Sequence, residues 1–305
     1  MAETDTEKAN TSTSGTTSRA TTLEKLARHR EALQKSSVAE EVLTALDTKS
    51  QPLRIVRCIG LGSPTSSAAA MYQLALLQLI VDTGDDTVVS LWDPAFSTED
   101  MEFFTHLGYV VEEKLSHTKV VAGAKINTGA EVEAEANTEA EVEAETDATE
   151  VEAEVEVEVC ANVDADADSS TTLYYMPHLP IDVLETIIAT EHPTRMLTND
   201  LSVYTFKYTD AKYFELYPNC ARIAHLTSST KTTTISSPDD GFVVVKKSRP
   251  RSRSRKAYVP PAVEYDMDSA FFLTAIATRI TSGQNTHSEW DSAFTDTSYY
   301  TLTKR

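Results

Sequence analysis

The stretch Ile55-Val-Arg-Cys-Ile-Gly-Leu-Gly-Ser63 decides the fold of this chain. Its first five residues are mostly apolar and β-branched, as in a buried strand, and the two glycines that follow permit a tight turn. A helix is expected over 67–82, with Ser66 or Ser67 as its N-cap. A strand, a glycine turn and a helix in this order are typical of the first unit of a parallel α/β sheet.

The segments that follow continue the alternation of strands and helices. We expect strands at 87–92, 109–111, 172–176 and 196–198. We expect helices at 99–107 (capped by Thr98), 181–190, 208–217 and 268–280, and a helical pair over 21–46 that breaks at Ser36-Ser37. The helical pair packs on the domain or, as an alternative, forms a coiled coil with a partner. The order predicts one three-layer, Rossmann-like α/β domain over 21–302 with a mostly parallel central sheet.

Charge is concentrated in one segment of the chain. The whole chain has 47 acidic and 27 basic residues and a net charge of −20, but residues 130–168 contain sixteen acidic residues and no basic one. The rest of the chain has 31 acidic and 27 basic residues, a balance of −4. The Glu-Val-Ala repeats predict a solvated, disordered insertion at 113–169, and the Thr/Ser-rich composition of 1–20 predicts a disordered tail.

Deleting residues 130–168 is expected to leave the melting temperature nearly unchanged, because an acidic segment without aromatic residues buries little apolar surface. Calorimetry of the deletion variant beside the full chain checks this expectation. A large loss of stability would mean that the Glu-Val repeats form a strand or helix of the core.

A second disordered insertion is expected at 227–257. Seven basic residues lie between Lys246 and Lys256, several of them alternating with serine. This run could bind phosphate backbones or act as a nuclear import signal, or it is a solvated loop that offsets the acidic insertion. Because the run lacks interleaved aromatic residues, we expect no nucleic-acid binding beyond a weak interaction of Lys246–Lys256.

Cysteine spacing and hydropathy exclude several classes of protein. Cys58, Cys160 and Cys220 are far apart and form no CxxC pair, so we expect neither a metal site nor a disulfide framework. The longest apolar stretch, 68–81, is too short to span a bilayer and contains two glutamines. The first residues also lack the pattern of a signal peptide. We therefore expect a soluble intracellular protein without membrane contact.

A set of residues follows the predicted strands at their carboxyl ends. Its members are Gly60, Gly62, Ser63, Asp93, Pro94, His178 and Asn199. In open α/β sheets, ligands bind outside the carboxyl ends of the strands. These residues are therefore predicted to line one ligand-binding crevice.

The residues of this crevice allow two interpretations, one functional and one structural. The glycine turn and Asp93 resemble the layout of adenosyl-methionine-dependent methyltransferases, because an acid at the end of the second strand can accept ribose hydroxyls. Thr65 replaces the third glycine of a dinucleotide fingerprint. In the structural interpretation, the glycines only permit the turn and Asp93 caps the loop before Pro94. His178 is likewise either a ligand contact or general base, or a hydrogen-bonded structural residue.

Three longer blocks give the chain a family resemblance. Trp92-Asp-Pro-Ala-Phe96, Tyr175-Met-Pro-His178 and Trp290-Asp-Ser-Ala-Phe-Thr-Asp-Thr-Ser298 follow the glycine turn in this order. Together with the turn they resemble the Sensitivity to Red light Reduced (SRR-type) family, over residues 22–112, 171–226 and 265–302. One departure is Thr198-Asn199-Asp200, where the family typically has Gly-Asn-Ser.

The resemblance implies a regulatory protein that acts through protein partners. Members of the family are linked to light input and circadian timing in plants, and elsewhere to cytoskeletal or haem-related regulation. The family brings no catalytic activity, so no catalytic residue and no cofactor is carried over. The alternative is a methyltransferase-like or other nucleotide-binding enzyme, in which the Gly60–Gly62 turn and Asp93 would hold adenosyl-methionine or a nucleotide.

Overall fold

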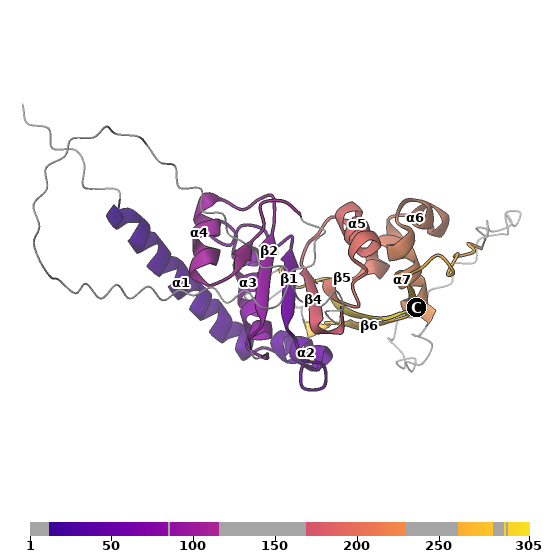
Figure 1. The fold of residues 1–305 in the computed structure, drawn as a ribbon, viewed down its shortest axis with the longest axis horizontal. Helices are drawn as coiled ribbons and strands as arrows, with labels where there is room; N and C mark the ends of the chain where they lie inside the picture. Colours follow the sequence, from indigo (N-terminus) through magenta and orange to yellow (C-terminus); the bar gives the residue numbers. More distant parts are fainter. Residues whose placement is uncertain (1–11, 85, 116–168, 230–261, 283–289, 291) are drawn as a thin grey trace, which may run out of the picture.

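A seven-stranded sheet forms the centre of the molecule (Figure 1). The computed structural model describes residues 12–84, 86–115, 169–229, 262–282, 290 and 292–305. Its strands lie in the order β3-β2-β1-β4-β5-β7-β6. They are β1 (Ile55–Ile59), β2 (Val88–Trp92), β3 (Val110–Val111), β4 (Thr172–Met176), β5 (Arg195–Asn199), β6 (Phe272–Arg279) and β7 (Thr297–Lys304). Strands β1 to β5 are parallel, whereas β7 is antiparallel to both β5 and β6.

Helices cover both faces of this sheet. Residues of α1 (Ser12–Gln34), α2 (Ser37–Leu46), α3 (Ala68–Val81) and α4 (Thr98–His106) belong to one hydrophobic core. Residues of α5 (Ile181–Glu191), α6 (Asp210–Leu216) and α7 (Pro218–Ser229) belong to a second core, which also includes Leu201 of the 3-10 helix η2 (Leu201–Phe206). Successive strand residues point to opposite faces, so Cys58 of β1 enters the first core and Ile59 enters the second. The predicted three-layer α/β fold with a mostly parallel sheet is therefore confirmed.

Capping serines define the first residues of helices α2 and α3. The Oγ of Ser36 accepts the backbone N–H of Ala39 and starts α2, and the break predicted at this serine pair separates α1 from α2. The Oγ of Ser67 accepts the N–H of Ala70 in the same way at the start of α3. Because an N-cap side chain satisfies an otherwise unpaired N–H group, each helix begins at a defined residue. Helix α3 therefore starts directly beside the glycine turn.

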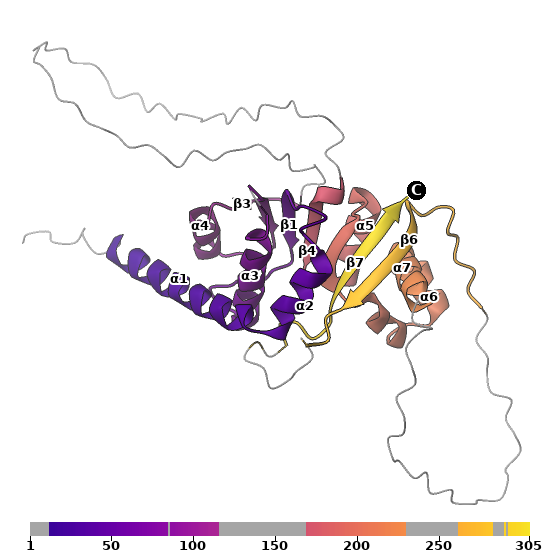
Figure 2. The same ribbon diagram turned by 90° about the horizontal axis from the view of Figure 1, so that it is seen from below.

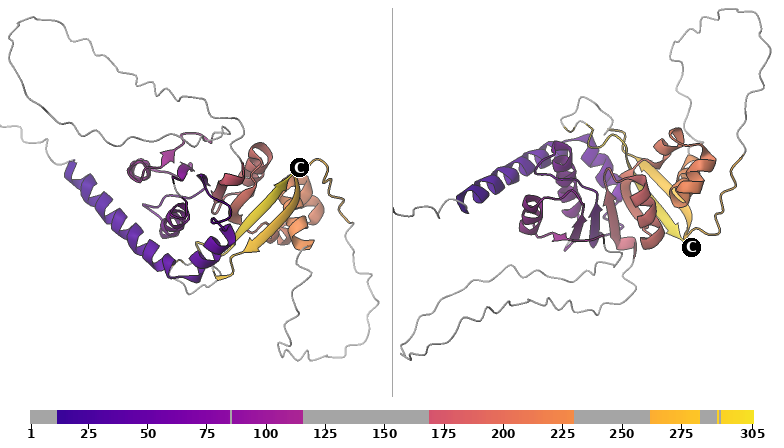
Figure 3. Two further views of the ribbon diagram at one scale, coloured as in Figure 1. Left: turned by 60° about the horizontal axis from the view of Figure 1, so that its bottom comes forward. Right: turned by 90° about the horizontal axis from the view of Figure 1, so that it is seen from above.

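The helix predicted over 268–280 is wrong, since this segment contains strand β6. Its apolar residues recur at helical spacing, but its backbone pairs along the whole length of β7. A register shift between Phe272 and Thr274 places Phe272, Ala275 and Ala277 against the second core. Figures 2 and 3 show β6 and β7 side by side, and in Figure 2 α7 lies behind them. Tertiary pairing has overridden a local helical pattern here.

Helix boundaries and one further helix also differ from the prediction. Helix α1 begins at Ser12, so residues 12–20 are helical, and Ser97 rather than Thr98 caps α4. Helix α7 was not expected, and its last residues take up the start of the segment 227–257. The remainder of that segment, with the basic run, lies outside the described residues, as do residues 1–11 and 116–168 of the tail and the acidic insertion.

Two of the three cysteines lie in the described residues. Cys58 and Cys220 are both free and buried, and burial raises the pKa of each thiol. A thiol held in its neutral form is a poor nucleophile, which makes these two residues part of the packing. Cys160 lies outside the described residues. Among the helices that the structure describes, none has both the length and the apolar composition to cross a bilayer.

Candidate functional site

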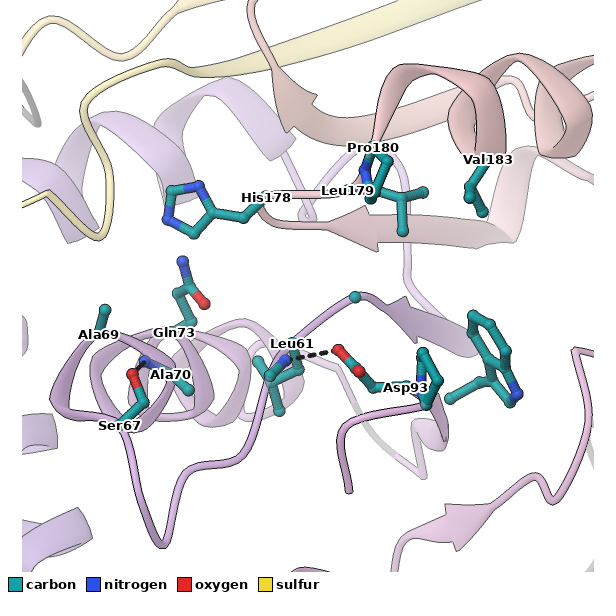
Figure 4. A pocket seen from close by; sticks show the side chains of 14 residues that line it. Leu61, Ser67, Ala69, Ala70, Gln73, Asp93, His178, Leu179, Pro180 and Val183 are labelled. Carbon is teal, nitrogen blue, oxygen red and sulfur yellow. Dashed lines mark hydrogen bonds between the residues drawn. The ribbon is translucent and has the colours of Figure 1, made fainter. Parts of the chain in front are cut away.

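A cavity of about 370 Å³ lies at the carboxyl ends of β1 and β4. These two neighbouring strands are followed by α3 and α5, whose residues pack on opposite faces of the sheet. The two chain segments thus diverge at this point, which is where open α/β sheets form ligand crevices. The lining residues come from the loops after β1, β2 and β4 and from α3 and α5: Gly60, Leu61, Gly62, Ser67, Ala69, Ala70, Gln73, Trp92, Asp93, Pro94, His178, Leu179, Pro180 and Val183 (Figure 4).

The glycine turn forms one wall of this cavity. Gly60 and Gly62 have φ angles of +77° and +75°, values at which residues with a Cβ are strained. The N–H of Gly60 donates to the carbonyl of Trp92, and the N–H of Gly62 donates to Oδ2 of Asp93 at 2.7 Å. The turn is therefore tied to the end of β2 by two backbone donors.

Asp93 uses both carboxylate oxygens to brace the neighbouring loops. Oδ2 accepts the N–H of Gly62, and Oδ1 accepts the N–H of Ala95 at 2.7 Å. These contacts agree with the structural interpretation of this acid. Each carboxylate oxygen has a second acceptor position. Because Asp93 also lines the cavity, it retains the capacity to accept a hydroxyl of a bound ligand.

Asp100, which the sequence did not single out, is a second acid behind the turn. Its Oδ1 accepts the N–H and hydroxyl of Thr65 at 3.1 and 2.8 Å, and its Oδ2 accepts the N–H and hydroxyl of Ser97 at 2.9 and 2.8 Å. Burial alone would raise the pKa of this carboxyl, but the hydrogen bonds, with Ser63 among their donors, outweigh burial and lower it. The stabilisation from Asp100 is therefore present at neutral pH and is lost as the pH falls through its lowered pKa.

The two acids change what the turn can bind. The N–H groups of Gly62 and Thr65 both donate to carboxylates, Asp93 and Asp100 respectively. A turn that cradles phosphate needs such N–H groups free to face the anion. The apolar lining and the nearby acid therefore suit a neutral or apolar group at this wall better than a phosphate.

His178 forms the opposite rim. Its φ is +54°, a left-handed conformation in which asparagine and histidine are tolerated better than most residues. Its N–H donates to Oδ1 of Asn199 at 3.2 Å, and Nδ2 of Asn199 donates to the carbonyl of Leu179 at 3.4 Å. Desolvation lowers the pKa of the imidazole, and the Asp296 carboxylate acts in the opposite direction. The Met-Pro-His loop is thus held from the end of β5.

Gln73 faces His178 across the cavity (Figure 4). This residue of α3 is buried, and its Nε2 donates to the carbonyl of Ala293 at 3.1 Å. The backbone carbonyl of Gln73 accepts a hydrogen bond from the Tyr175 hydroxyl at 3.2 Å. Because Gln73 is a polar residue in the otherwise apolar helix α3, the sequence could have indicated it as a residue of the site.

The structure places five of the seven predicted site residues in the cavity wall: Gly60, Gly62, Asp93, Pro94 and His178. Asn199 lies one step behind it and holds the His178 loop. Ser63 lies in the turn, with its hydroxyl 3.3 Å from that of Thr65. Within the described residues, no three His, Cys, Asp or Glu side chains come together as a metal site.

Gly60→Ala is expected to be more destabilising than Gly108→Ala. Both glycines have φ +77°, so both substitutions carry the same backbone strain of about 1–2 kcal/mol. A Cβ at Gly60 would lie 2.7 Å from Cδ1 of Leu179 and 3.3 Å from the carbonyl oxygen of Pro177, whereas a Cβ at Gly108 meets nothing within 4 Å. Gly60→Ala should therefore cost about 1 kcal/mol more. Urea unfolding of both variants measures the difference, and equal losses would contradict the close approach of the two loops.

Comparison with known protein families identifies the family that the sequence motifs around the cavity indicate. The model of the SRR1 domain matches residues 23–301. The chain belongs to the SRR1 domain family. The match includes the glycine turn, the Asp93 and His178 loops, and the last two strands of the sheet. This confirms the family resemblance that the sequence blocks indicated. No curated protein and no solved structure matches the chain.

Proposed function

We propose that this SRR1 domain protein is a regulatory protein that acts by binding, in signalling of the light or circadian type or in a related cellular process. In this proposal the crevice recognises a small molecule, and its occupancy alters the association with protein partners in the cytoplasm and nucleus. The observation that carries the proposal is the cavity of about 370 Å³ where the glycine turn, Asp93 and His178 meet. Its size falls within the range of small-molecule sites.

The lining indicates the chemistry of the ligand. Most of the lining is apolar, with Trp92, Leu179 and Val183 among the larger side chains. A few polar groups, chiefly Asp93, Gln73 and His178, are available to orient a ligand. A largely apolar pocket with few convergent polar groups is typical of sites for small organic molecules. We therefore propose a mostly apolar ligand with one or two hydrogen-bonding groups.

A second candidate is a methyltransferase-like or other nucleotide-binding enzyme. Two observations favour it: Asp93 lies at the end of β2 within the cavity wall, and the sheet carries an antiparallel β7 between β5 and β6. Both resemble the adenosyl-methionine-dependent methyltransferases. Fold-level likeness does not establish an activity, so the site itself must decide.

A pocket-filling variant tests the first proposal. Val183 of α5 lines the cavity, so Val183→Phe should block it, while Ala189→Phe adds the same side chain at an exposed position of the same helix. The immobilised full chain is incubated with a small-molecule extract, and retained compounds are identified by mass spectrometry. We expect a compound that the parent and Ala189→Phe retain and that Val183→Phe does not. Equal retention by all three proteins, or none by any, would contradict the proposal.

Thermal-shift measurements separate the second candidate. Adenosyl-methionine, adenosyl-homocysteine, NAD and ATP are each added to the full chain. A ligand at one hundred times its dissociation constant stabilises a protein by about 2.7 kcal/mol, which such measurements detect. Stabilisation by one of these compounds, lost in Asp93→Asn, would favour the enzyme. His178→Asn, which keeps a residue suited to the left-handed conformation, then tests whether the imidazole contributes.

A further inference from the structure

A second cavity, of about 520 Å³, lies between α1 and the start of α3. Lys25, Arg28 and His29 line it from α1, where their i, i+3 and i+4 spacing places them on one face of the helix. The turn before α3 and its first residues, including Ser67, form the other side. No acidic residue is among the lining residues that the structure describes. The side chains that line the cavity thus carry positive and no negative charge, and the Asp100 carboxylate lies behind Thr65, on the side of the turn.

The two cations of this cavity differ from the other basic residues in and directly after α1. Arg19 and Arg30 of α1 are paired with Glu102 and Asp82, and Lys35, which follows the helix, is paired with Glu31. Within the described residues, Lys25 and Arg28 form no ion pair with a carboxylate. Among these residues, the basic side chains of α1 are thus paired except where the helix lines the cavity. This selective lack of partners points to a ligand that supplies the negative charge.

Two further groups are held in place around these cations. Nδ1–H of His29 donates to the carbonyl of Lys25 at 2.7 Å, and the His29 ring lies 4.0 Å from the Tyr72 ring, between centroids. With the ring proton on Nδ1, the Nε2 atom of His29 is an acceptor, which can take the hydrogen of a protonated phosphate oxygen. Ser67 caps α3 by accepting an N–H, so its hydroxyl proton is free to be donated. The N-terminus of α3, which is the positive end of the helix dipole, also favours a negatively charged ligand in this cavity.

We propose that this cavity binds an anion of the phosphate type, either free phosphate or the phosphate of a small organic ester. A guanidinium can hold two phosphate oxygens through paired N–H donors, an ammonium adds a mobile point charge, and the Ser67 hydroxyl offers a third kind of donor. Ser67 lines both cavities, so a phosphate ester bound here could extend its organic part into the pocket at Gly60. The anion site itself does not depend on the function proposed for that pocket.

The experiment uses the full chain and two probes, inorganic phosphate and phenyl phosphate, in isothermal titration at constant ionic strength set with chloride. We expect both probes to bind, and the double variant Lys25→Gln/Arg28→Gln to lose at least tenfold in affinity. Lys35→Gln removes a positive charge from an exposed position directly after the same helix, outside the cavity, and should bind as the parent does. Melting temperatures of all variants report whether each remains folded.

The outcomes separate the two sources of phosphate. Tighter binding of phenyl phosphate, with the gain lost in Val183→Phe, would indicate an ester that reaches the pocket at Gly60. Equal affinities that Val183→Phe leaves unchanged would indicate free phosphate, even if that pocket binds nothing. Binding of neither probe would overturn the proposal. So would equal losses in Lys35→Gln and the double variant, because the attraction would then be a general effect of charge.

Discussion

Arg195→Met is expected to destabilise the folded chain by about 3–5 kcal/mol, because four buried contacts lose their donor at once. Arg195 starts β5 and is 1% exposed. Its Nε donates to the Tyr299 hydroxyl at 3.0 Å, its Nη2 to the carbonyl of Leu46 at 2.8 Å, and its Nη1 to the carbonyls of Gln51 and Ser170 at 3.2 and 3.1 Å. One side chain thus joins the end of α2, the loop at Gln51, the 3-10 helix Ser169–Thr171 before β4, and β7. Urea unfolding followed by circular dichroism measures the loss.

Arg54→Met provides the matched control for this prediction. Arg54 is an exposed arginine just before β1, so its replacement should change stability by less than about 0.5 kcal/mol. A loss in Arg195→Met as small as that of the control would mean that water replaces the four contacts without cost. In that case Arg195 would not be a structural centre of the sheet.

Glu191→Gln is expected to destabilise the chain by about 3 kcal/mol, because it leaves a buried guanidinium without its main counter-charge. The side chains of Arg57 on β1 and Glu191 at the end of α5 are only 3% and 4% exposed, and they form an ion pair. Glu112 supplies a second carboxylate to Arg57 at 3.2 Å. These carboxylates raise the pKa of Arg57 although burial acts to lower it. Thermal unfolding of the variant measures the effect.

A triple variant distinguishes loss of the ion pair from a general disturbance of α5. Arg57→Met/Glu112→Gln/Glu191→Met removes the guanidinium together with both of its carboxylate partners, and exchanging buried ionic groups in this way is often neutral. It should therefore be more stable than Glu191→Gln alone. The exposed Glu113→Gln serves as the control for removal of one carboxylate. A triple variant less stable than the single one would contradict the account of a buried guanidinium that has lost its main partner.

The sequence predicted those parts of the fold that local patterns determine. The order of strands and helices from Ile55 to Asn199, and the convergence of the glycine turn with Asp93 and His178 at one edge, follow from parallel strands ending at a common edge. Strand β6 was missed because its apolar spacing resembles a helix and only its pairing with β7 makes it a strand. Helix α7 had a signal, Pro218 at its first position, that went unused.

Side-chain contacts between distant segments were beyond prediction. Asp100 belongs to the capping box of α4, a local pattern, yet its contact with Thr65 joins residues 35 positions apart. The contact between Gln73 and Ala293 spans 220 positions. Which carboxylates of the described residues lie near Lys25 and Arg28 likewise depends on how the fold places them around α1. Such contacts follow from the assembled sheet and not from any window of sequence.

The position of β7 has a consequence for synthesis of the protein. In the part of the chain that the structure describes, strand β6 joins the sheet through β7 alone, although β6 comes first along the chain. While the ribosome is still making residues 297–304, the growing polypeptide can assemble β1 to β5 but must leave the hydrogen-bonding edge of β5 unoccupied. An open edge of this kind invites pairing with other nascent chains. We therefore expect the nascent chain to need protection by chaperones until Lys304 has emerged from the ribosome.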